Sequence, residues 1–258
     1  MNTALTIAGT DPSGGAGMQA DLKTFTALKV YGMCAITAVL AQNTCGVRLI
    51  ENVSIPMVEA QLDCVFEDIF PDAVKIGMVS SIPIIDAIAG KLRQYQAKNV
   101  VLDTVMVSTS GHRLIDKDAQ NALITKLMPL SDIITPNLPE AEVLCGFPIS
   151  NKEEQVKAAQ KIAESYDGYI MIKGGHFDGG DDLLYKDGQV RWYPTKRVDT
   201  HNTHGTGCTL SSAIAAYLAK GEPMEDAVAK AKEYITGALA SGLDLGKGNG
   251  PVDHCFAL

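Results

Sequence analysis

The sequence predicts an α/β fold built on a mainly parallel sheet. Short apolar runs alternate with longer amphipathic segments along the whole chain, as expected for strands that alternate with helices. Several runs end in glycine or a small polar residue, as at Gly9 and Gly77, and ligands bind at the carboxyl ends of strands in such sheets. With 258 residues, 46% of them hydrophobic, the chain can bury a large core, and we expect a single domain over residues 1–258.

The composition favours a small-molecule ligand. A formal net charge of −8 opposes a general affinity for nucleic acid or for an anionic membrane surface. The N-terminal residues carry no basic leader, and no apolar run is long enough to span a bilayer, so we expect a cytoplasmic protein. The six cysteines are scattered with no Cys-x-x-Cys pair, which opposes a zinc ribbon and a disulfide framework and favours reduced thiols.

The first strand, loop and helix form one unit. The apolar run Ala4–Ala8 predicts a strand, and the amphipathic pattern of Met18–Val30 predicts a helix. The loop 9–17 between them is rich in turn-forming residues and lets a ligand approach the backbone. Its Gly-Ala-Gly-Met-Gln-Ala resembles a dinucleotide fingerprint, but no acidic residue between Asp21 and Glu51 is present to hold a ribose. NAD and FAD are therefore disfavoured.

A second buried strand is predicted by the apolar run Cys34–Ala41, which would deliver Gln42 to the carboxyl edge of the sheet. The amide of Gln42 offers one carbonyl and one NH2 group, which can pair with the edge of a heterocycle. Taken alone, a turn cap explains Gln42 better.

The middle of the chain continues the alternation. A proline at the first helical position begins a predicted helix over Pro56–Phe70, and Ala73–Gly77 is a third apolar strand. The amphipathic segment Ile84–Gln96 predicts the next helix. The apolar run Asn99–Leu102 then predicts a strand that delivers Asp103 to the same edge.

The following segment contains a polar, glycine-containing loop, residues 104–114, which could form a mobile flap. The amphipathic pattern of Asp116–Leu127 predicts a helix, and the short apolar run Ile133–Thr135 predicts a strand that enters a proline-bounded turn. Glu140 then falls in the first turn of a helix. A favourable charge at a helix N-terminus and a metal-associated acid explain it about equally well.

Towards the C-terminus, Lys152–Ser165 predicts an exposed amphipathic helix and Tyr169–Ile172 a buried strand. That strand ends in Lys173 and two glycines, which fits either a phosphate contact or an ordinary turn. An Asp-Gly pair at 187 and 188 lies between two strand-forming runs and predicts a hairpin. The amphipathic pattern of Met224–Leu243 predicts the last helix.

The most informative stretch is His201–Ser212, in which a glycine-rich loop feeds an alanine-rich helix. Unpaired backbone N–H groups and the positive end of the helix dipole would meet at Gly205–Cys208 and attract an anion. A thiol in the first helical turn has its thiolate favoured by the dipole, so Cys208 could accept a proton near neutral pH. Alternatively, Cys208 is a small buried hydrophobe.

Taken together, these stretches resemble the bacterial hydroxymethylpyrimidine/phosphomethylpyrimidine kinases of thiamin synthesis, within the ribokinase superfamily. The resemblance covers essentially the whole chain in order. The matching stretches are Ile7–Gly17, Gln19–Phe25, Ala41–Thr44, Lys75–Met78, Val101–Val107, Ile134–Ala141, Lys173–His176, Asn202–Ser211 and Gly250–His254.

The resemblance implies a ribokinase-like three-layer α/β/α sandwich with a mainly parallel sheet and a small β-hairpin. It implies ATP as the phosphoryl donor with Mg²⁺, and a monovalent cation is a further candidate. Two transfers follow: one to the 5-hydroxymethyl group of 4-amino-5-hydroxymethyl-2-methylpyrimidine, and a second to the resulting monophosphate. The resemblance also implies a homodimer.

Site residues are carried over by matching motif. Cys208 resembles the catalytic base, and the Gly205 and Gly207 amides would hold the transferring charge. The residues expected to bind the pyrimidine are Gly9, Asp21, Gln42, Met78 and Val105. The residues expected to contact the nucleotide are Asn137, Lys173, Thr203 and Thr206. The acids expected to associate with the metal are Asp103 and Glu140.

Two other functions remain open. Related pyridoxal kinases carry a second cysteine in the flap, where this chain has Ser108, Thr109 and Ser110, which favours the pyrimidine as the main substrate. A side activity on pyridoxal is plausible because both substrates carry a hydroxymethyl group on an aromatic ring. A non-catalytic pyrimidine sensor is disfavoured because a binder needs no base such as Cys208.

Overall fold

A computed structural model describes residues 1–106, 117–175, 181–194 and 198–258. Within these residues, eight strands form one sheet in the order β10-β9-β8-β7-β6-β5-β1-β2. Neighbours from β2 to β8 are parallel, whereas β9 and β10 run antiparallel at one end. The strands of this sheet are β1 (Thr3–Ala8), β2 (Tyr31–Ile36), β5 (Ala73–Ile76), β6 (Val100–Leu102), β7 (Ile133–Ile134), β8 (Tyr169–Ile172), β9 (Asp182–Lys186) and β10 (Gln189–Tyr193).

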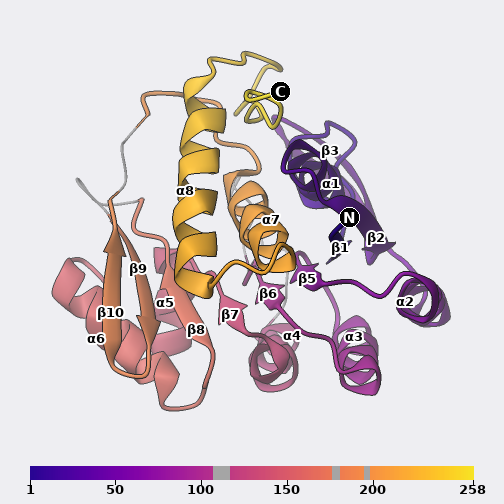
Figure 1. Cartoon of the computed structure of the whole chain (residues 1–258), viewed down its shortest axis with the longest axis horizontal. Coiled ribbons are helices and arrows are strands. Elements are labelled where there is room, and N and C mark those ends of the chain that lie inside the picture. The colour runs from indigo at the N-terminus through magenta and orange to yellow at the C-terminus, as the bar shows by residue number, and fades with distance from the viewer. Residues whose placement is uncertain (107–116, 176–180, 195–197) are drawn as a thin grey trace.

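Helices cover both faces of the sheet (Figure 1). One layer contains α1 (Gly17–Ala27), α7 (Thr206–Ala219) and α8 (Met224–Ala240). The other contains α2 (Ile55–Asp68), α3 (Ile82–Tyr95), α4 (Lys117–Ala122), α5 (Leu138–Cys145) and α6 (Lys152–Ala163).

The strands are apolar throughout because both of their faces are buried. In β6, for example, Val100 and Leu102 pack against the α3 layer, whereas Val101 packs against the α7 layer. Continuous apolar runs are typical of parallel sheets with helices on both sides. The predicted three-layer α/β/α sandwich is therefore confirmed.

The hairpin predicted around Asp187 and Gly188 is also confirmed. β9 and β10 pair in antiparallel register from Asp182–Tyr193 to Lys186–Gln189. The two turn residues, Asp187 and Gly188, both have positive φ, at 48° and 80°. Such a turn matches the right-handed twist of the paired strands, and an Asp-Gly sequence adopts it readily.

The prediction of one buried strand over Cys34–Ala41 is wrong. β2 ends at Ile36, and the chain turns at Thr37, whose backbone N–H donates to the Ala8 carbonyl at 3.0 Å and whose hydroxyl donates to the Met78 carbonyl at 2.9 Å. The next strand, β3 (Ala38–Asn43), leaves the sheet and pairs with β4 (Gly46–Asn52) in a separate hairpin. Gln42 therefore lies on this β3–β4 hairpin.

The helix predicted over Asp116–Leu127 begins, in the described residues, with α4 at Lys117 and then changes its hydrogen bonding. Residues Leu123–Leu127 form a π-helical turn and Met128–Leu130 a 3₁₀ turn, where Pro129 lacks an N–H donor. Most of the predicted flap, residues 107–114, lies outside the described residues, together with Asp116.

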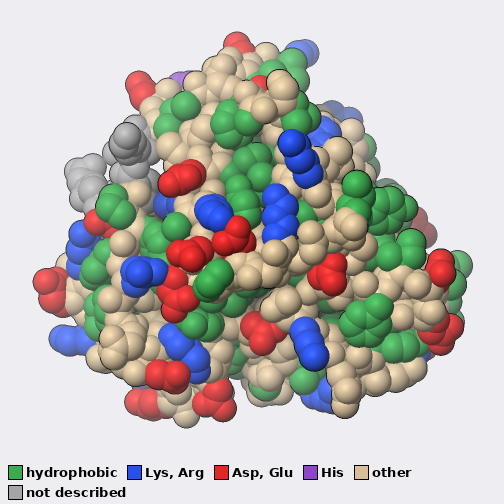
Figure 2. All heavy atoms as spheres, viewed as in Figure 1, with side chains coloured by type: hydrophobic (Ala, Val, Ile, Leu, Met, Phe, Trp, Pro, Cys, Tyr) green, Lys and Arg blue, Asp and Glu red, His purple; other side chains and the backbone are tan. Residues whose placement is uncertain are grey.

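On the face that carries α7 and α8, Lys and Arg side chains are interspersed with Asp and Glu side chains (Figure 2). Among the described residues, no helix combines the length and the apolar character that a membrane crossing requires.

Candidate active site

The carboxyl ends of β1, β5, β6, β7 and β8 meet the N-terminus of α7, and most of the predicted site residues lie there. Lys173 follows β8, Asp103 follows β6, and Gly77 and Met78 follow β5. This meeting point follows from the parallel pairing, which brings the carboxyl ends of neighbouring strands to one edge of the sheet.

The N-terminus of α7 is held against the loop 9–17. Gly205 is its N-cap with φ +81°, and a Cβ atom there would lie 1.8 Å from the Gly15 carbonyl oxygen. Only glycine allows this approach. The N–H of Thr206 donates to the Thr203 carbonyl at 3.3 Å, whereas in the described part of the chain no backbone carbonyl is recorded as accepting the N–H groups of Gly207 and Cys208. These two donors suit an anion.

Charged side chains surround the N-terminal turn of α7, Gly205–Cys208, which we call the helix mouth. A Cβ atom on Gly207 would lie 3.5 Å from both Asp103 Oδ2 and Lys173 Nζ. Lys173 Nζ donates to Asp103 Oδ1 at 3.3 Å, and the Ser211 hydroxyl donates to Asp103 Oδ2 at 3.3 Å. Burial opposes the charge on Lys173, but Asp103 and Glu140 outweigh it and raise the pKa of the lysine. The Lys173 ammonium group therefore lies beside the backbone N–H groups of Gly207 and Cys208.

Glu140 serves the fold and also lies near the charged cluster. Its carboxylate accepts the Asn137 N–H at 3.0 Å, while Asn137 Oδ1 accepts the Glu140 N–H at 2.9 Å, which forms a capping box. Burial raises the pKa of Glu140, Lys173 opposes the rise, and Asp103 adds to it. Both explanations of Glu140, a favourable charge at a helix N-terminus and a metal-associated acid, are compatible with this position. Because Asn137 uses its oxygen as a cap, its NH2 group is the part left for a ligand.

The turn after Lys173 is supported by a residue that the sequence did not single out. Asp182 on β9 is buried, and its Oδ1 accepts the Gly174 N–H at 2.8 Å. Its Oδ2 accepts a bond from Lys232 of α8 at 2.6 Å. Asp182 thus fixes the backbone beside Lys173. His176, at the end of the same motif, lies outside the described residues.

Cys208 lies in the first turn of α7, as predicted, but its environment differs from the expected one. Burial raises the pKa of the thiol to about 11; Lys75 lowers it, Asp21 and Asp103 raise it further, and the Gly17 N–H lowers it. The prediction that the helix dipole favours a thiolate near neutral pH is therefore wrong for the ligand-free protein, because desolvation outweighs the dipole. Burial therefore favours the neutral thiol over the thiolate.

The expected pyrimidine residues lie on the β1 side of Cys208. A Cβ atom on Gly9 would lie 3.7 Å from the Met78 sulfur and 3.0 Å from a methyl carbon of Leu40. Met78 and Val105 are both half-buried. Gln42 reaches over from the β3–β4 hairpin, and its Nε2 lies 3.4 Å from His204 Nε2.

A buried dyad orients the Gln42 amide, and sequence reasoning missed it. His204 Nε2 lies 2.7 Å from Asp11 Oδ2, so this ring nitrogen carries the proton and donates it to the carboxylate. An amide NH2 facing the same N–H would set two donors against each other. Because amide oxygen and nitrogen positions are interchangeable by a flip, the satisfied arrangement places the Gln42 oxygen towards His204 and leaves the NH2 group for a ligand.

We expect Asp11→Asn to destabilise the protein at neutral pH. Burial opposes ionisation of Asp11, but hydrogen bonds from His204 and Ser13 outweigh it and lower its pKa from 3.8 to about 2. The depressed pKa contributes about 2 kcal/mol to the free energy of unfolding at pH values above 3.8, and this contribution is lost as the pH falls towards 2. In urea unfolding, the free energies of unfolding of the unchanged protein and of Asp11→Asn should differ by that amount at pH 7 and by less near pH 3. A constant gap would contradict the assigned bonds.

Asp21, which the resemblance assigns to the pyrimidine, pairs with a lysine in the ligand-free protein. Its side chain is fully buried, and both carboxylate oxygens accept bonds from Lys75 at 2.9 and 2.8 Å. This arrangement exposes no part of the Asp21 side chain to a ligand. Among the other expected residues, Thr203 and Thr206 are half-buried at the start of α7, where the Thr206 hydroxyl donates to the Thr203 carbonyl at 3.1 Å.

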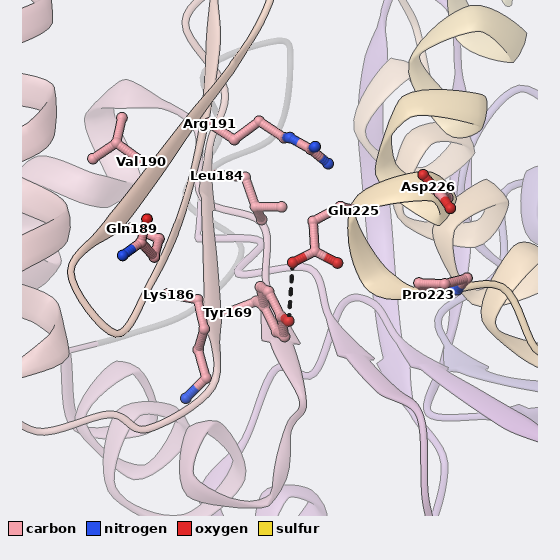
Figure 3. A pocket seen from close by; sticks show the side chains of 9 residues that line it. All are labelled: Tyr169, Leu184, Lys186, Gln189, Val190, Arg191, Pro223, Glu225 and Asp226. Carbon is pink, nitrogen blue, oxygen red and sulfur yellow. Dashed lines mark hydrogen bonds between the residues drawn. The ribbon is translucent and has the colours of Figure 1, made fainter.

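Two surface hollows lie at the opposite edge of the sheet and contain none of these residues. One, of about 430 Å³, is formed by the β9–β10 hairpin and the start of α8 (Figure 3). The Tyr169 hydroxyl donates there to Glu225 at 3.2 Å. The other, of about 500 Å³, is lined by residues such as Asn99 and Asp132 that precede β6 and β7. Ligands of open α/β sheets bind at the carboxyl edge, so we place the site at α7.

Comparisons with known proteins show which proteins this chain resembles. A family model described as phosphomethylpyrimidine kinase matches residues 11–253. The hydroxymethylpyrimidine/phosphomethylpyrimidine kinase of Rhizobium meliloti is 49% identical over 256 residues, which cover 97% of this chain and 96% of that protein. The thiamine biosynthesis bifunctional protein ThiED of Geobacter sulfurreducens is 47% identical over 257 residues; 99% of this chain is covered, but this chain spans only about half (52%) of that protein.

A solved structure shows the same fold. The ADP complex of Bacillus subtilis pyridoxal kinase has a TM-score of 0.91 and 38% sequence identity, with 98% of this chain and 97% of that chain covered. A ribokinase-like kinase with a bound nucleotide product thus shares the arrangement of strands and helices described above.

Proposed function

This chain belongs to the phosphomethylpyrimidine kinase family, and from that membership we propose that it phosphorylates 4-amino-5-hydroxymethyl-2-methylpyrimidine twice in thiamin biosynthesis. ATP is the phosphoryl donor in both steps. The observation that supports this best is the helix mouth, where Cys208, two amides without a recorded acceptor, Lys173 and Asp103 lie together. Phosphoryl transfer mainly requires such positioning of donors around the moving charge.

In the first step the substrate hydroxyl oxygen forms a bond to the terminal phosphorus, the bond from that phosphorus to the bridging oxygen breaks, and ADP leaves. The hydroxyl proton passes to the Cys208 sulfur when the sulfur is ionised. The Gly205, Gly207 and Cys208 N–H groups and the Lys173 ammonium hold the charge of the transferring oxygens. In the second step the attacking group is already an anionic phosphate, so little proton removal is needed.

A divalent cation fits the acids at this edge. Asp103 and Glu140 offer carboxylate oxygens, and the raised pKa of Glu140 marks a place where added positive charge would favour ionisation. In the described residues no group of three or more acidic, His or Cys side chains could hold a metal. Mg²⁺ commonly keeps several waters and substrate phosphates beside one or two carboxylates, so this pair is sufficient. The bound ion would neutralise phosphate charge.

The two transfers are expected to differ in pH dependence. Because burial raises the pKa of Cys208 to about 11, the thiolate fraction grows as the pH rises through neutrality. We expect kcat/KM of the first transfer to rise by up to about tenfold per pH unit between about pH 7 and 9. The second transfer should stay nearly flat over that range. Parallel profiles for the two acceptors would contradict the role of Cys208 as the base.

Gln42→Leu is expected to weaken pyrimidine recognition more than stability. Losing a hydrogen bond to the bound ring should lower kcat/KM for the pyrimidine alcohol by about 10- to 100-fold. Because Gln42 is only half-buried, the thermal unfolding temperature should change little. Gln61→Leu, at another half-buried glutamine on α2, is the control and should leave kcat/KM unchanged. Equal losses in the two variants would remove Gln42 from the site.

Pyridoxal is the competing substrate, and the similarity to a pyridoxal kinase structure supports testing it. Both kinase functions are separated from a non-catalytic sensor by measuring ADP release with each alcohol. We expect kcat/KM to be higher for the pyrimidine alcohol than for pyridoxal. Higher kcat/KM with pyridoxal would favour vitamin B6 salvage, and binding without ADP release would favour a sensor.

Further features support the remaining expectations. One eight-stranded sheet carries elements from β1 to β10, which supports a single kinase domain over residues 1–258. The use of ATP supports a cytoplasmic location.

For the homodimer, edge strand β2 and the β3–β4 hairpin expose Tyr31, Val39 and Leu49 by 49%, 54% and 65%, an apolar surface that a second copy could cover. Val39→Lys should then lower the molar mass measured by light scattering.

A further inference from the structure

A fully buried ion pair lies beneath the helix mouth. Lys75 on β5 and Asp21 on α1 both have 0% exposed side chains, and Lys75 Nζ lies 2.9 and 2.8 Å from the two Asp21 oxygens. Thr6 is the register partner of Lys75 across β1 and β5, and its hydroxyl donates to Asp21 at 2.5 Å. No other ion pair recorded for the described residues is completely buried at both ends.

Such a pair is not an efficient way to stabilise a fold. Removing two charges from water costs several kcal/mol each, and apolar residues of similar volume often stabilise a protein equally well. The strand around Lys75 is otherwise apolar, with Val74 and Ile76 fully buried. A charge at this position therefore calls for a role besides packing.

The pair is connected to Cys208 by hydrogen bonding and by charge. The Ser212 hydroxyl lies 2.5 Å from Asp21 Oδ1 and 2.7 Å from the Cys208 carbonyl oxygen, so it joins the pair to the first turn of α7. The Lys75 ammonium and the Cys208 sulfur are near enough to affect each other's ionisation.

We propose that Lys75 is a positioning residue whose ammonium group stabilises negative charge on the Cys208 sulfur, and that Asp21 holds this ammonium in place instead of binding the pyrimidine. The proposal rests on the proposed function, in which Cys208 takes the substrate proton. Before that step the half-buried sulfur must be a thiolate, and a fixed cation lowers the free energy of that state.

The charged groups that are near enough to affect the ionisation of the sulfur act in opposite directions. Lys75 from β5 and the Gly17 N–H at the start of α1 favour the thiolate, whereas Asp21 from α1 and Asp103 after β6 disfavour it. Removing Lys75 and removing Asp21 should therefore move the ionisation of Cys208 in opposite directions. A pair that served only packing would produce no such split.

The test is the pH dependence of Cys208 alkylation by iodoacetamide in the substrate-free protein, followed by mass spectrometry of the Cys208 peptide. Asp21→Asn should move the alkylation midpoint down by about one pH unit or more, and Lys75→Met should move it up by a similar amount. Lys91→Met, which breaks the partly exposed pair between Lys91 and Asp63, is the control and should leave the midpoint unchanged.

Single replacements leave one buried charge without its partner and can unfold the protein. The double variant Lys75→Met/Asp21→Leu removes both charges and should fold, with its midpoint above that of the unchanged protein because Lys75 affects the sulfur more than Asp21 does. It should also lose at least about tenfold in kcat for the first transfer. A folded double variant with an unchanged midpoint and unchanged kcat overturns the proposal, as do single variants that shift in the same direction.

Alkylation needs no substrate, so the inference and the proposed function fail separately. If the unchanged protein phosphorylates the pyrimidine while the midpoints of the variants stay together, the positioning role fails alone. If the unchanged protein forms no phosphorylated pyrimidine, the proposed function fails whatever the midpoints show, and with it the assignment of Lys75 to that reaction.

Discussion

Replacing Cys208 with alanine is expected to lower kcat for the first phosphorylation by about 10²- to 10⁴-fold, the usual contribution of a general base. The alcohol must lose its proton as the new bond to phosphorus forms, and the thiolate of Cys208 is the acceptor in the proposed reaction. The second phosphorylation starts from an anionic monophosphate and should fall much less. Single-turnover rates measured separately with the alcohol and with the monophosphate test this difference.

Cys208→Ser is the matched companion variant, because it keeps the size of the side chain but replaces the thiol with a far weaker acid. It should resemble the alanine variant in the first transfer and the unchanged protein in the second. Binding of both pyrimidines should be measured by calorimetry to show that the pocket is intact. If Cys208→Ala abolished both transfers equally with binding preserved, proton removal by the sulfur would be refuted.

Gly205→Ala is expected to remove most activity and to lower stability by several kcal/mol. An alanine at φ +81° costs about 1–2 kcal/mol by itself. Its Cβ atom would also lie 1.8 Å from the Gly15 carbonyl oxygen, so the loop 9–17 must move away from the start of α7. Because Cys208 faces the Gly17 N–H across this junction, the displacement should lower kcat/KM at least about tenfold.

Gly221→Ala separates the cost of a positive φ from the cost of the contact with the Gly15 carbonyl. Gly221 has φ +82°, but a Cβ atom there would have no neighbour within 4 Å. This control should show the conformational cost alone and keep full kinase activity. Urea unfolding of both variants measures the difference, which is the cost of the contact with Gly15. Equal stabilities and equal activities would show that the junction between the two loops is unimportant.

Strand positions were predictable because both faces of the sheet are buried. Tyr169–Ile172 is apolar at every position, and the observed β8 has the same bounds. Cys34–Ala41 has the same appearance, yet it contains a turn at Thr37 that separates β2 from β3. Val39 is 54% exposed on the β3–β4 hairpin, so an apolar residue there gave a misleading signal of burial.

Within the site, the sequence indicated the groups that follow strands or begin a helix. Lys173 and Asp103 could be placed together because parallel strands share a carboxyl edge. Contacts between segments that are far apart in the sequence could not be derived in this way. Lys75 meets Asp21 across 54 positions of the chain, and His204 meets Asp11 across 193.

The ionisation of Cys208 shows how burial changes a local prediction. The sequence places a thiol at a helix N-terminus, where the dipole favours the thiolate by a modest amount. Desolvation depends on what packs around the sulfur, which only the folded chain reveals, and here it raises the pKa to about 11. A buried cation such as Lys75 then becomes important for the chemistry.

The most direct test of a two-step pyrimidine kinase is mass spectrometry of the products formed from ATP, Mg²⁺ and 4-amino-5-hydroxymethyl-2-methylpyrimidine. The site at the mouth of α7 predicts that the monophosphate accumulates first and is then converted to the diphosphate, with one ADP released at each step. A chain that leaves the pyrimidine alcohol unmodified, or that phosphorylates pyridoxal alone under the same conditions, would contradict this function.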